Sequence, residues 1–593
     1  MIKYCVATHQ TKRFKTREVL VGNVGVGGNN PVRIQSMTTS NTRDVDATMD
    51  QVMRLADLGC EIARITVQGI KEAESCELIK NGLIKRGYNI PLVADIHFFP
   101  AAAMRVVDFV DKVRINPGNF VDKRASFKIL EYDDATYAKE LERIEEKFAP
   151  LIEKCKTLKR AMRIGTNHGS LSDRIMNRFG DTPRGMVESA LEFARVCRKY
   201  DYHSFLFSMK ASNPQVMIQA YRLLNAEMMR LGWDYPLHLG VTEAGEGEDG
   251  RIKSAMGIGS LLLDGLGDTV RISLTEDPWF EIDPCKRLIS FASSYEGKGA
   301  YPFAETFRSV DEIKKREVAF EPPFRKEGSV ILSLREMSEN LYMDLGYEVQ
   351  LGRPVSSLSN VDLIQTESSD PKLKHLPKVL PSDVIKVTEE DSSTWETFLE
   401  KTPKWIALSF KEDRLHNSRR FFEWMMQKGL KIPLILNFSY SCSKEDVIIR
   451  AGAECGALLA DGIGEGVWLE GPYELGFLRT LSLNILQAAR MRTSKTEFIS
   501  CPGCGRTLFN LQEVSKRIRD KTGHLPGVKI AIMGCIVNGP GEMADADFGY
   551  VGSKTGMVDL YIGKQCYQKD IPFDEADDRL IELIKESGLW LEK

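Results

Sequence analysis

The sequence predicts an α/β protein whose largest part is an N-terminal (β/α)8 TIM barrel. Short apolar runs alternate with amphipathic helical stretches from about residue 30 to 295, and the runs number eight. Eight strand–helix units in succession favour a closed parallel barrel, with an open doubly wound sheet as the structural alternative. The end of this pattern recurs near residue 433, and a cysteine-rich segment follows it. We therefore expect three domains: a barrel at 1–295, an inserted barrel-like α/β domain at 296–488 and a small α/β metal-binding domain at 489–593.

The predicted barrel strands are short and rich in branched apolar residues, as strands that are buried on both faces tend to be. Helical stretches such as 49–58 and 215–231 lie between them. The eight predicted strands cover residues 32–36, 62–66, 91–95, 112–116, 160–165, 205–210, 236–240 and 269–273.

Bulk composition argues against several classes of function. The chain has 593 residues, a net charge of −3 and an isoelectric point of about 6.3, so a nucleic-acid or membrane-surface binder is not expected. No run approaches the roughly 18 consecutive apolar residues of a membrane span. Most of the twelve cysteines are scattered through apolar runs without framework spacing. This pattern indicates buried free thiols in a reducing compartment, and we expect a cytoplasmic protein.

Polar side chains gather at the predicted carboxyl ends of the barrel strands, which in a barrel all open onto one face. Arginine holds phosphate through paired hydrogen bonds, so the five basic residues there favour a diphosphate-type ligand. A single arginine is more often part of a surface ion pair, but four arginines and a lysine at equivalent strand ends favour a binding site. The polar residues are Arg64, Asp95, His97, Arg114, Asn116, Arg163, Asn167, His168, Lys210, His238, Glu243, Arg271 and Ser273.

The inserted region repeats the end of the barrel in a degenerate form. Overlaying residues 433–465 on 236–268 without a gap matches Asp461 to Asp264, and it also matches two glycines that follow each aspartate. The polar positions are not kept, because Ile435 stands at the place of His238 and Tyr440 at that of Glu243. We interpret the insert as a barrel-like copy that kept its packing and lost its chemistry. Chance similarity of two β/α units is the alternative.

The C-terminal region carries three cysteines and a carboxylate in a suggestive order. Cys501 and Cys504 flank Pro-Gly, and Cys535 precedes Glu542 by seven residues among several glycines and a proline. Thiolates favour zinc or iron–sulfur clusters, and small residues let the backbone approach a bulky inorganic core. We favour an iron–sulfur cluster with a carboxylate at one displaceable corner over a structural zinc knuckle. Helices near 511–521 and 575–587 and strands near 528–533, 548–551 and 558–562 would complete an α/β domain.

A set of motifs in this order resembles the 4-hydroxy-3-methylbut-2-enyl diphosphate synthase family of the non-mevalonate (MEP) route to isoprenoids and terpenoids. The resemblance covers residues 10–295 and 490–565, and the insert resembles the extra domain of the long, three-domain form. The motifs are Gln35-Ser-Met-Thr38, Ala94-Asp-Ile-His-Phe98, Arg114-Ile-Asn-Pro-Gly-Asn119, Arg163-Ile-Gly165, Val241-Thr-Glu-Ala-Gly245, Gly267-Asp-Thr-Val-Arg-Ile-Ser273, Cys501-Pro-Gly-Cys504 and Gly534-Cys-Ile-Val-Asn-Gly-Pro-Gly-Glu542.

The resemblance implies an oxidoreductase that reductively opens 2-C-methyl-D-erythritol 2,4-cyclodiphosphate to the linear allylic diphosphate and water. Two electrons would come from ferredoxin or flavodoxin through a [4Fe–4S] cluster. By motif, the cluster ligands would be Cys501, Cys504, Cys535 and Glu542. Glu243 would be the proton donor, with Asp95 and His97 near it. The implied diphosphate-binding residues are Arg64, Arg114, Arg163, Asn167, Lys210, Arg271 and Ser273.

Two features depart from the short bacterial form of this family. His168 stands where a smaller residue is usual, and residues 120–159 are expected to form a much longer loop. In the short form, the family's cluster domain caps the barrel of a partner subunit. We expect the insert to act as a spacer that lets one chain close its own site.

Two other functions fit parts of the sequence. A barrel lyase or aldolase would use Lys210 as a Schiff-base amine beside a structural zinc domain. A non-catalytic iron–sulfur electron carrier would need no arginine-rich mouth.

Overall fold

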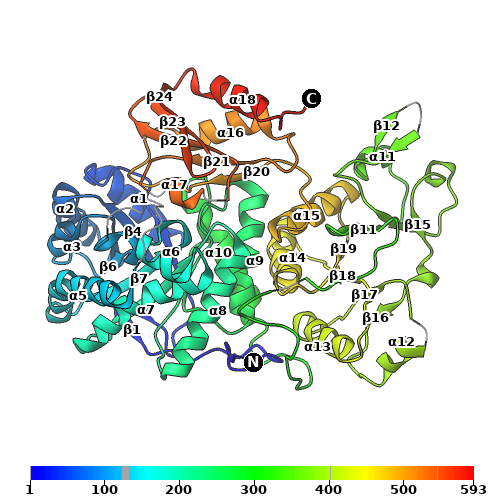
Figure 1. Cartoon of the computed structure of the whole chain (residues 1–593), viewed down its shortest axis with the longest axis horizontal. Helices are drawn as coiled ribbons and strands as arrows, with labels where there is room; N and C mark the ends of the chain where they lie inside the picture. Colours follow the sequence, from blue (N-terminus) through cyan, green and yellow to red (C-terminus); the bar gives the residue numbers. More distant parts are fainter. Residues whose placement is uncertain are drawn as a thin grey trace.

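The computed structural model describes residues 2–122, 132–313, 315–350, 353–400, 402–537, 539–543 and 545–592. Figure 1 shows a helix-ringed barrel (blue to green), a second α/β unit beside it (green to yellow) and a small unit (orange to red) above the barrel. The predicted fold class is confirmed, because a parallel barrel is followed by an open parallel sheet and a small α/β unit. Among these residues, no helix has both the length and the apolar character that a membrane crossing needs.

The barrel sheet has the strand order β8-β7-β6-β5-β4-β3-β10-β9 with parallel pairing throughout. Its two outer strands meet at a parallel bridge between Phe207 and Leu237, where the Phe207 N–H donates to the Pro236 carbonyl over 2.9 Å. The sheet therefore closes, and an open doubly wound sheet is excluded. The strands are β3 (Arg33–Met37), β4 (Ile62–Val67), β5 (Leu92–Ile96), β6 (Lys112–Ile115), β7 (Ala161–Asn167), β8 (Phe205–Lys210), β9 (His238–Leu239) and β10 (Thr269–Val270).

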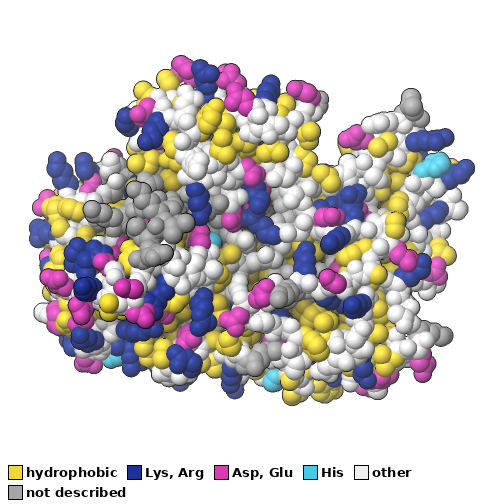
Figure 2. Space-filling model, viewed as in Figure 1, with side chains coloured by type: hydrophobic (Ala, Val, Ile, Leu, Met, Phe, Trp, Pro, Cys, Tyr) yellow, Lys and Arg dark blue, Asp and Glu magenta, His cyan; other side chains and the backbone are white. Residues whose placement is uncertain are grey.

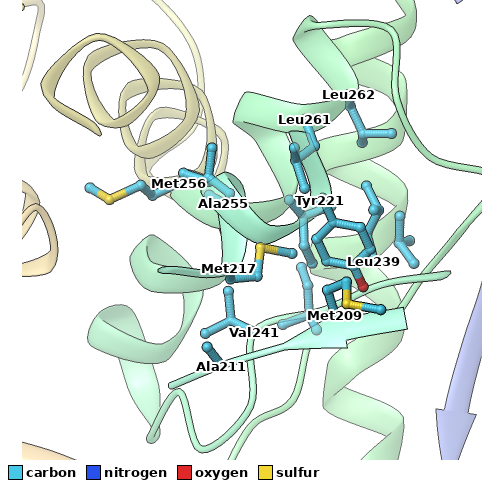
Figure 3. Packing of buried hydrophobic residues seen from close by; sticks show 14 of the residues in the cluster. Met209, Ala211, Met217, Tyr221, Leu239, Val241, Ala255, Met256, Leu261 and Leu262 are labelled. Atoms are coloured by element: carbon cyan, nitrogen blue, oxygen red, sulfur yellow. The ribbon is translucent and has the colours of Figure 1, made fainter. Parts of the chain in front are cut away.

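Helices surround the barrel and bury their apolar faces against it. Several begin at a capping side chain: Asp44 accepts from the Ala47 N–H, and Asn213 accepts from the Gln215 N–H. Figure 3 shows how side chains of α8 and α9 pack against those of the neighbouring strands. The helices are α1 (Val45–Asp57), α2 (Ile70–Lys85), α3 (Pro100–Val106), α4 (Pro117–Phe120), α5 (Asp134–Thr157), α6 (Asp173–Phe179), α7 (Pro183–Lys199), α8 (Pro214–Leu231), α9 (Gly247–Leu263) and α10 (Ile282–Ser293).

The segment at 120–159 is not the long loop that was expected. Helix α5 occupies residues 134–157 and begins where Asp133 accepts from the Thr136 N–H over 2.7 Å. Its apolar face is buried through residues such as Ile144, Phe148 and Leu151. Burial of that stripe explains why a highly charged segment is helical. Residues 123–131 lie outside the described residues.

A short hairpin plugs the amino-terminal end of the barrel. It consists of β1 (Val19–Val21) and β2 (Val24–Val26), which pair antiparallel. Its valines form one apolar cluster with Ile62, Val93, Ala161 and Leu206, which stand at the starts of four barrel strands. Among the described residues, this hairpin therefore covers the amino-terminal end of the barrel with apolar side chains.

The insert is built on a seven-stranded parallel sheet, a half-barrel with the order β15-β14-β11-β19-β18-β17-β16. No pairing joins its outer strands among the described residues, so the copy is open. The strands are β11 (Ser329–Ser333), β14 (Leu363–Gln365), β15 (Lys378–Val379), β16 (Lys386–Val387), β17 (Ile406–Leu408), β18 (Leu434–Ser439) and β19 (Gly466–Glu470), with a hairpin β12 (Glu348–Gln350) and β13 (Arg353–Val355). The helices are α11 (Leu341–Asp344), α12 (Thr397–Glu400), α13 (Arg414–Gln427), α14 (Lys444–Ala460) and α15 (Leu475–Ala488).

Barrel and insert pack through α9 and α14, where small residues let the helices approach closely. A Cβ on Gly259 would lie 2.6 Å from the Ala453 Cβ, and one on Gly452 would lie 3.2 Å from the Ala255 Cβ. In Figure 3, Met256 points toward the pale yellow helix of the insert. A Cβ on Gly456 would come within 2.8 Å of that methionine side chain. The contact is tight enough to hold the two units as one body.

A buried ion-pair network crosses this interface, and it is nearly symmetric. Arg222 reaches Asp264 at 2.7 Å and Asp461 at 2.6 Å. Arg419 reaches the same two carboxylates at 2.9 and 2.8 Å. The overlay that matches Asp264 to Asp461 also matches Arg222 to Arg419. Matching positions of the two similar stretches therefore meet at the interface between the barrel and the insert.

The C-terminal unit is a five-stranded sheet with the order β20-β21-β22-β23-β24, parallel in its first two pairings and antiparallel in the last two. The predicted strands and helices are present, and β20, α17 and β24 are additional. The elements are β20 (Glu497–Ser500), β21 (Lys529–Met533), β22 (Phe548–Lys554), β23 (Met557–Ile562), β24 (Gln565–Pro572), α16 (Leu511–Thr522), α17 (Gly539–Glu542) and α18 (Ala576–Glu586).

Candidate active site

One cavity lies where the barrel mouth meets the C-terminal unit. All ten barrel residues predicted for substrate binding and catalysis line it, together with Met37 and Thr242. The thiol-bearing loops after β20 and β21 cover it and contribute Cys501, Cys504, Cys535 and Arg506. The ten barrel residues are Arg64, Asp95, His97, Arg114, Arg163, Asn167, Lys210, Glu243, Arg271 and Ser273.

Three other polar residues from the same pattern do not line the cavity. Asn116 caps α4 by accepting from the Gly118 N–H over 3.1 Å. His238 lies fully buried within the barrel, with its Nδ1 2.5 Å from the Thr269 hydroxyl. His168 pairs with Asp181 at 3.1 Å, and that carboxylate also binds Lys564 of the C-terminal unit at 3.0 Å. The unusual histidine therefore supports the contact between the two units.

Asp95 is the anionic centre of the mouth. Arg114 donates to its Oδ1 over 3.0 Å, and His97 Nε2 lies 3.4 Å from Oδ2. Burial opposes ionisation of Asp95, but Arg114 and Arg64 outweigh it and hold the pKa of the carboxyl well below its ordinary value. Burial lowers the pKa of His97 to about 3, so its imidazole is neutral and accepts a hydrogen bond from Arg114.

Three other barrel cations of the mouth, Arg64, Arg163 and Lys210, form no ion pair with a carboxylate among the described residues. Arg163 is fully buried and donates to the Ser208 hydroxyl over 3.1 Å, while its Nε and Nη2 have no partner among the described residues. Arg64 is directed at the Met37 sulfur, about 3 Å away. Burial, and then the neighbouring Arg64 and Arg163, lower the pKa of Lys210. Unpaired buried donors of this kind are costly unless an anion satisfies them.

Arg271 is the exception, because a carboxylate holds it rigidly. Its Nε and Nη2 donate to Glu281 over 3.0 and 2.9 Å. Ser36 donates to the same carboxylate over 2.6 Å. Glu281 comes from the segment after β10 and was not predicted from the sequence. The one feature of the sequence that could have indicated this role of Glu281 is its position ten residues after Arg271.

Two buried carboxyls meet where the barrel contacts α17. The side-chain nitrogen of Asn167 donates to Glu542 Oε1 over 2.6 Å. The side-chain oxygen of Asn167 accepts a hydrogen bond from Arg114 over 3.1 Å. Burial raises the pKa of both the Glu243 and the Glu542 carboxyl, and the neighbouring Glu243 raises that of Glu542 further. Glu243 sits at a φ of 48°, a left-handed conformation that a non-glycine residue adopts at a cost. The fold therefore holds Glu243 in a strained backbone conformation, and in that conformation its side chain lines the mouth.

The thiol loops suit a large inorganic group better than a single ion. Among the described residues, no three His, Cys, Asp or Glu side chains converge on one metal position, as tetrahedral zinc requires. In an iron–sulfur cluster each thiolate binds its own iron, so the ligands are spread apart. The Gly534 N–H donates to the Cys501 sulfur over 3.3 Å, and Glu542 Oε2 is buried without a partner. Three soft thiols line the cavity, and the unpartnered oxygen of Glu542 lies in α17, whose first residue, Gly539, also lines it; this donor set fits a cluster.

The C-terminal unit covers the barrel of its own chain. Lys253 of α9 pairs with Glu497 of β20 at 2.9 Å, and the Thr275 hydroxyl donates to the Ser500 carbonyl over 3.2 Å. The backbones of Gly169 and Gly541 touch, since a Cβ on Gly169 would fall 2.1 Å from the Gly541 carbonyl carbon. Closure within one chain is thus the arrangement seen here.

Arg506 is the most important cavity residue that sequence reasoning missed. It follows Cys504 by two positions and reaches across to Asp95 of the barrel at 3.3 Å. Its place in the thiol loop was a signal that could have found it. Its partner lies 411 positions earlier in the chain, and no local pattern predicts that pairing.

The fold and this cavity define a barrel enzyme whose basic mouth suits an anionic ligand and is covered by a thiol-bearing domain. The GcpE TIM-barrel domain matches residues 16–286, and the GcpE protein C-terminal domain matches residues 497–586. The chain belongs to the GcpE family of 4-hydroxy-3-methylbut-2-en-1-yl diphosphate synthases, which are oxidoreductases.

Relatives extend over the whole chain. The 4-hydroxy-3-methylbut-2-en-1-yl diphosphate synthase (flavodoxin) of Protochlamydia amoebophila (strain UWE25) is 62% identical over 100% of this chain and 98% of its own. The chloroplastic ferredoxin enzyme of the same name from Oryza sativa subsp. japonica is 50% identical over 100% of this chain and 89% of its own.

Solved barrel structures are much less similar. The 3-dehydroquinate dehydratase of Geobacillus kaustophilus HTA426 is 15% identical, with a TM-score of 0.32 over 48% of this chain and 99% of that chain. A structural similarity this weak indicates nothing about the function of this chain.

Proposed function

We propose that this chain reduces 2-C-methyl-D-erythritol 2,4-cyclodiphosphate to (E)-4-hydroxy-3-methylbut-2-enyl diphosphate, as the printed names of its relatives suggest. The reaction breaks a ring C–O bond, consumes two electrons and releases one hydroxyl as water. The observation that carries the proposal is the single cavity in which unpaired barrel cations face three thiols and a free carboxylate oxygen.

Cys501, Cys504, Cys535 and Glu542 would hold a [4Fe–4S] cluster. When bound, the cluster supplies the two electrons and a Lewis-acid iron at the carboxylate corner. We infer that flavodoxin or ferredoxin, the donors in the names of the relatives, delivers these electrons.

The chain's own residues would bind and orient the substrate. Arg163 would offer its two nitrogens that have no partner among the described residues to the diphosphate, and Arg64 and Lys210 would bind it beside them, while Glu281 keeps Arg271 fixed. Asn167 and Ser273 would complete the binding site. A substrate held at several points presents one carbon to the reacting centre, which lowers the entropic part of the barrier. The covering loops exclude water, so charge–charge attraction in the cavity is strong.

Glu243 is the proposed proton donor to the departing oxygen, with Asp95 and His97 positioning the neighbouring Arg114. It is buried, faces the cavity, and one of its oxygens has no partner among the described residues. The strained backbone at this residue is consistent with a position chosen for chemistry.

Glu243→Gln is expected to lower turnover by at least about a hundredfold, because a positioned general acid contributes roughly 10²–10⁴ in rate. Substrate affinity should stay within about threefold of the original, since glutamine preserves size and hydrogen bonding. Single-turnover kinetics and equilibrium binding measure the two effects separately. Glu246→Gln is the control, because that carboxylate pairs with Arg519 outside the cavity. Unchanged turnover in the Glu243 variant would assign the proton to another group.

The domains proposed at 1–295, 296–488 and 489–593 would divide the work into substrate binding, spacing and electron supply. A mixture of Cys535→Ala chains and Arg114→Ala chains should then stay inactive, because each cavity is completed within one chain. Activity of the mixture is compared with that of each variant alone. Recovery in the mixture would mean that chains exchange their C-terminal units, and the spacer role of the insert would be wrong.

The direct test of the proposed function is anaerobic incubation of the cluster-loaded protein with the cyclodiphosphate and a chemical reductant. The expected result is the linear diphosphate, identified by mass spectrometry. A protein that instead forms a borohydride-trapped adduct on Lys210 and releases no linear diphosphate would be a barrel lyase.

A further inference from the structure

The cations that line the cavity come almost entirely from the barrel. Of the six in its lining, five stand at barrel strand ends and one, Arg506, comes from the C-terminal unit. Against them the lining holds only two carboxylates, Asp95 and Glu243. The six cations are Arg64, Arg114, Arg163, Lys210, Arg271 and Arg506.

Arg506 uses only part of its guanidinium in the closed structure. Its side chain is 7% exposed, and Nη2 lies 3.3 Å from Asp95 Oδ2. Nη1 is buried and has no hydrogen-bond partner among the described residues. An arginine offers a rigid fork of donors, so one nitrogen can bind a ligand while another keeps its protein partner.

Asp95 does not neutralise Arg506 on its own. The same carboxylate receives Arg114 on Oδ1 at 3.0 Å, and His97 lies 3.4 Å from Oδ2. Two guanidinium groups therefore share one carboxylate, and the Cys504 sulfur, a proposed cluster ligand, is a further partner of Arg506. Nη1 still has no hydrogen-bond partner among the described residues, so it has a donor to offer to a further anion.

We propose that Arg506 is a substrate-binding residue that holds a phosphate oxygen of the bound diphosphate through Nη1 while Nη2 remains on Asp95. This proposal rests on the proposed function and deepens it. The barrel and the C-terminal unit then grip the same ligand from opposite sides. The ligand contacts both units only when they are closed. Its binding therefore favours the closed arrangement by the free energy that the additional contact with Arg506 contributes.

The test compares binding of inorganic pyrophosphate to the cluster-loaded full chain and its variants by anaerobic calorimetry. Arg506→Met should weaken pyrophosphate affinity by about ten- to a hundredfold, since hydrogen bonds to charged groups are worth roughly 1.5–3 kcal/mol. Arg506→Lys keeps the charge but cannot serve both partners in the same way, so an intermediate loss is expected.

Arg519→Met is the matched control. Arg519 also joins the C-terminal unit to the barrel, through Glu246 at 2.9 Å, but it does not line the cavity. Its removal should leave pyrophosphate affinity within about twofold of the original. Amide hydrogen exchange of residues 501–507 gives an independent readout of closure. Pyrophosphate should slow that exchange in the original chain and in Arg519→Met, but not in Arg506→Met.

Three results would contradict the proposed role of Arg506. If Arg506→Met binds pyrophosphate as well as the original chain does, Arg506 does not touch the ligand. If Arg506→Met and Arg519→Met weaken binding equally, Arg506 acts only by seating the C-terminal unit, and the proposal is likewise overturned. If the original chain binds neither pyrophosphate nor the cyclodiphosphate, the anion site itself is wrong and the proposed function fails with it.

Discussion

Replacing Cys535 by alanine is expected to leave a chain that folds but holds no stable [4Fe–4S] cluster. Turnover of the cyclodiphosphate should fall by at least about a thousandfold, because a cluster lacking one thiolate is not retained and metal binding requires its full ligand set. Iron and sulfide analysis together with the visible spectrum of anaerobic protein measures cluster content. The same samples give the turnover.

Cys566→Ala is the control for this prediction. Cys566 stands on β24 of the same unit and does not line the cavity, so its loss should leave cluster content and turnover unchanged. A Cys535→Ala chain with full iron, full sulfide and normal turnover would remove the proposed electron path.

Replacing Arg222 by methionine should destabilise the chain by about 3–5 kcal/mol, the usual cost of leaving a buried charge without its partner. Arg222 and both of its carboxylates are at most 1% exposed, so water cannot screen the loss. Chemical denaturation followed by circular dichroism measures the change. Arg419→Met should cost a similar amount, because it removes the equivalent member of the network.

Arg230→Met on the same helix provides the comparison for Arg222. Arg230 is 67% exposed and pairs with Glu227 in solvent, so its removal should cost at most about 0.5 kcal/mol. Equal midpoints for the Arg222 and Arg230 variants would show that the interface network does not hold the barrel and insert together.

Charged side chains of both signs are mixed on the surface that Figure 2 shows. On the face in Figure 2, basic and acidic side chains are interspersed, without one large basic area. The strong positive charge of this chain instead lies inside, at the barrel mouth. This location of the positive charge agrees with the small anionic substrate that we propose.

The barrel and the placement of its polar residues could be predicted because both depend on local patterns. Strands such as β4 and β8 are buried along their whole length. Such strands are rich in apolar residues, so they can be predicted from the sequence. Strand ends meet at one mouth in any such barrel, so Arg64, Lys210 and Arg271 could be brought together from the sequence alone.

Long-range partners could not be predicted in the same way. The pairing of Arg506 with Asp95, the support of Arg271 by Glu281 and the plug formed by β1 and β2 depend on how distant segments dock. The helix α5 was missed because its many charges obscured a narrow apolar stripe. The open edges of the half-barrel could not be predicted either, since closure depends on whether β15 and β16, the two outer strands, pair with each other.

The most direct measurement of the central claim is metal and sulfide analysis of anaerobically purified protein combined with Mössbauer spectroscopy, with and without the cyclodiphosphate. The account predicts about four irons and four sulfides per chain, with one iron distinct from the other three and altered when the substrate binds. Zinc without inorganic sulfide, or four equivalent irons that ignore the substrate, would contradict it.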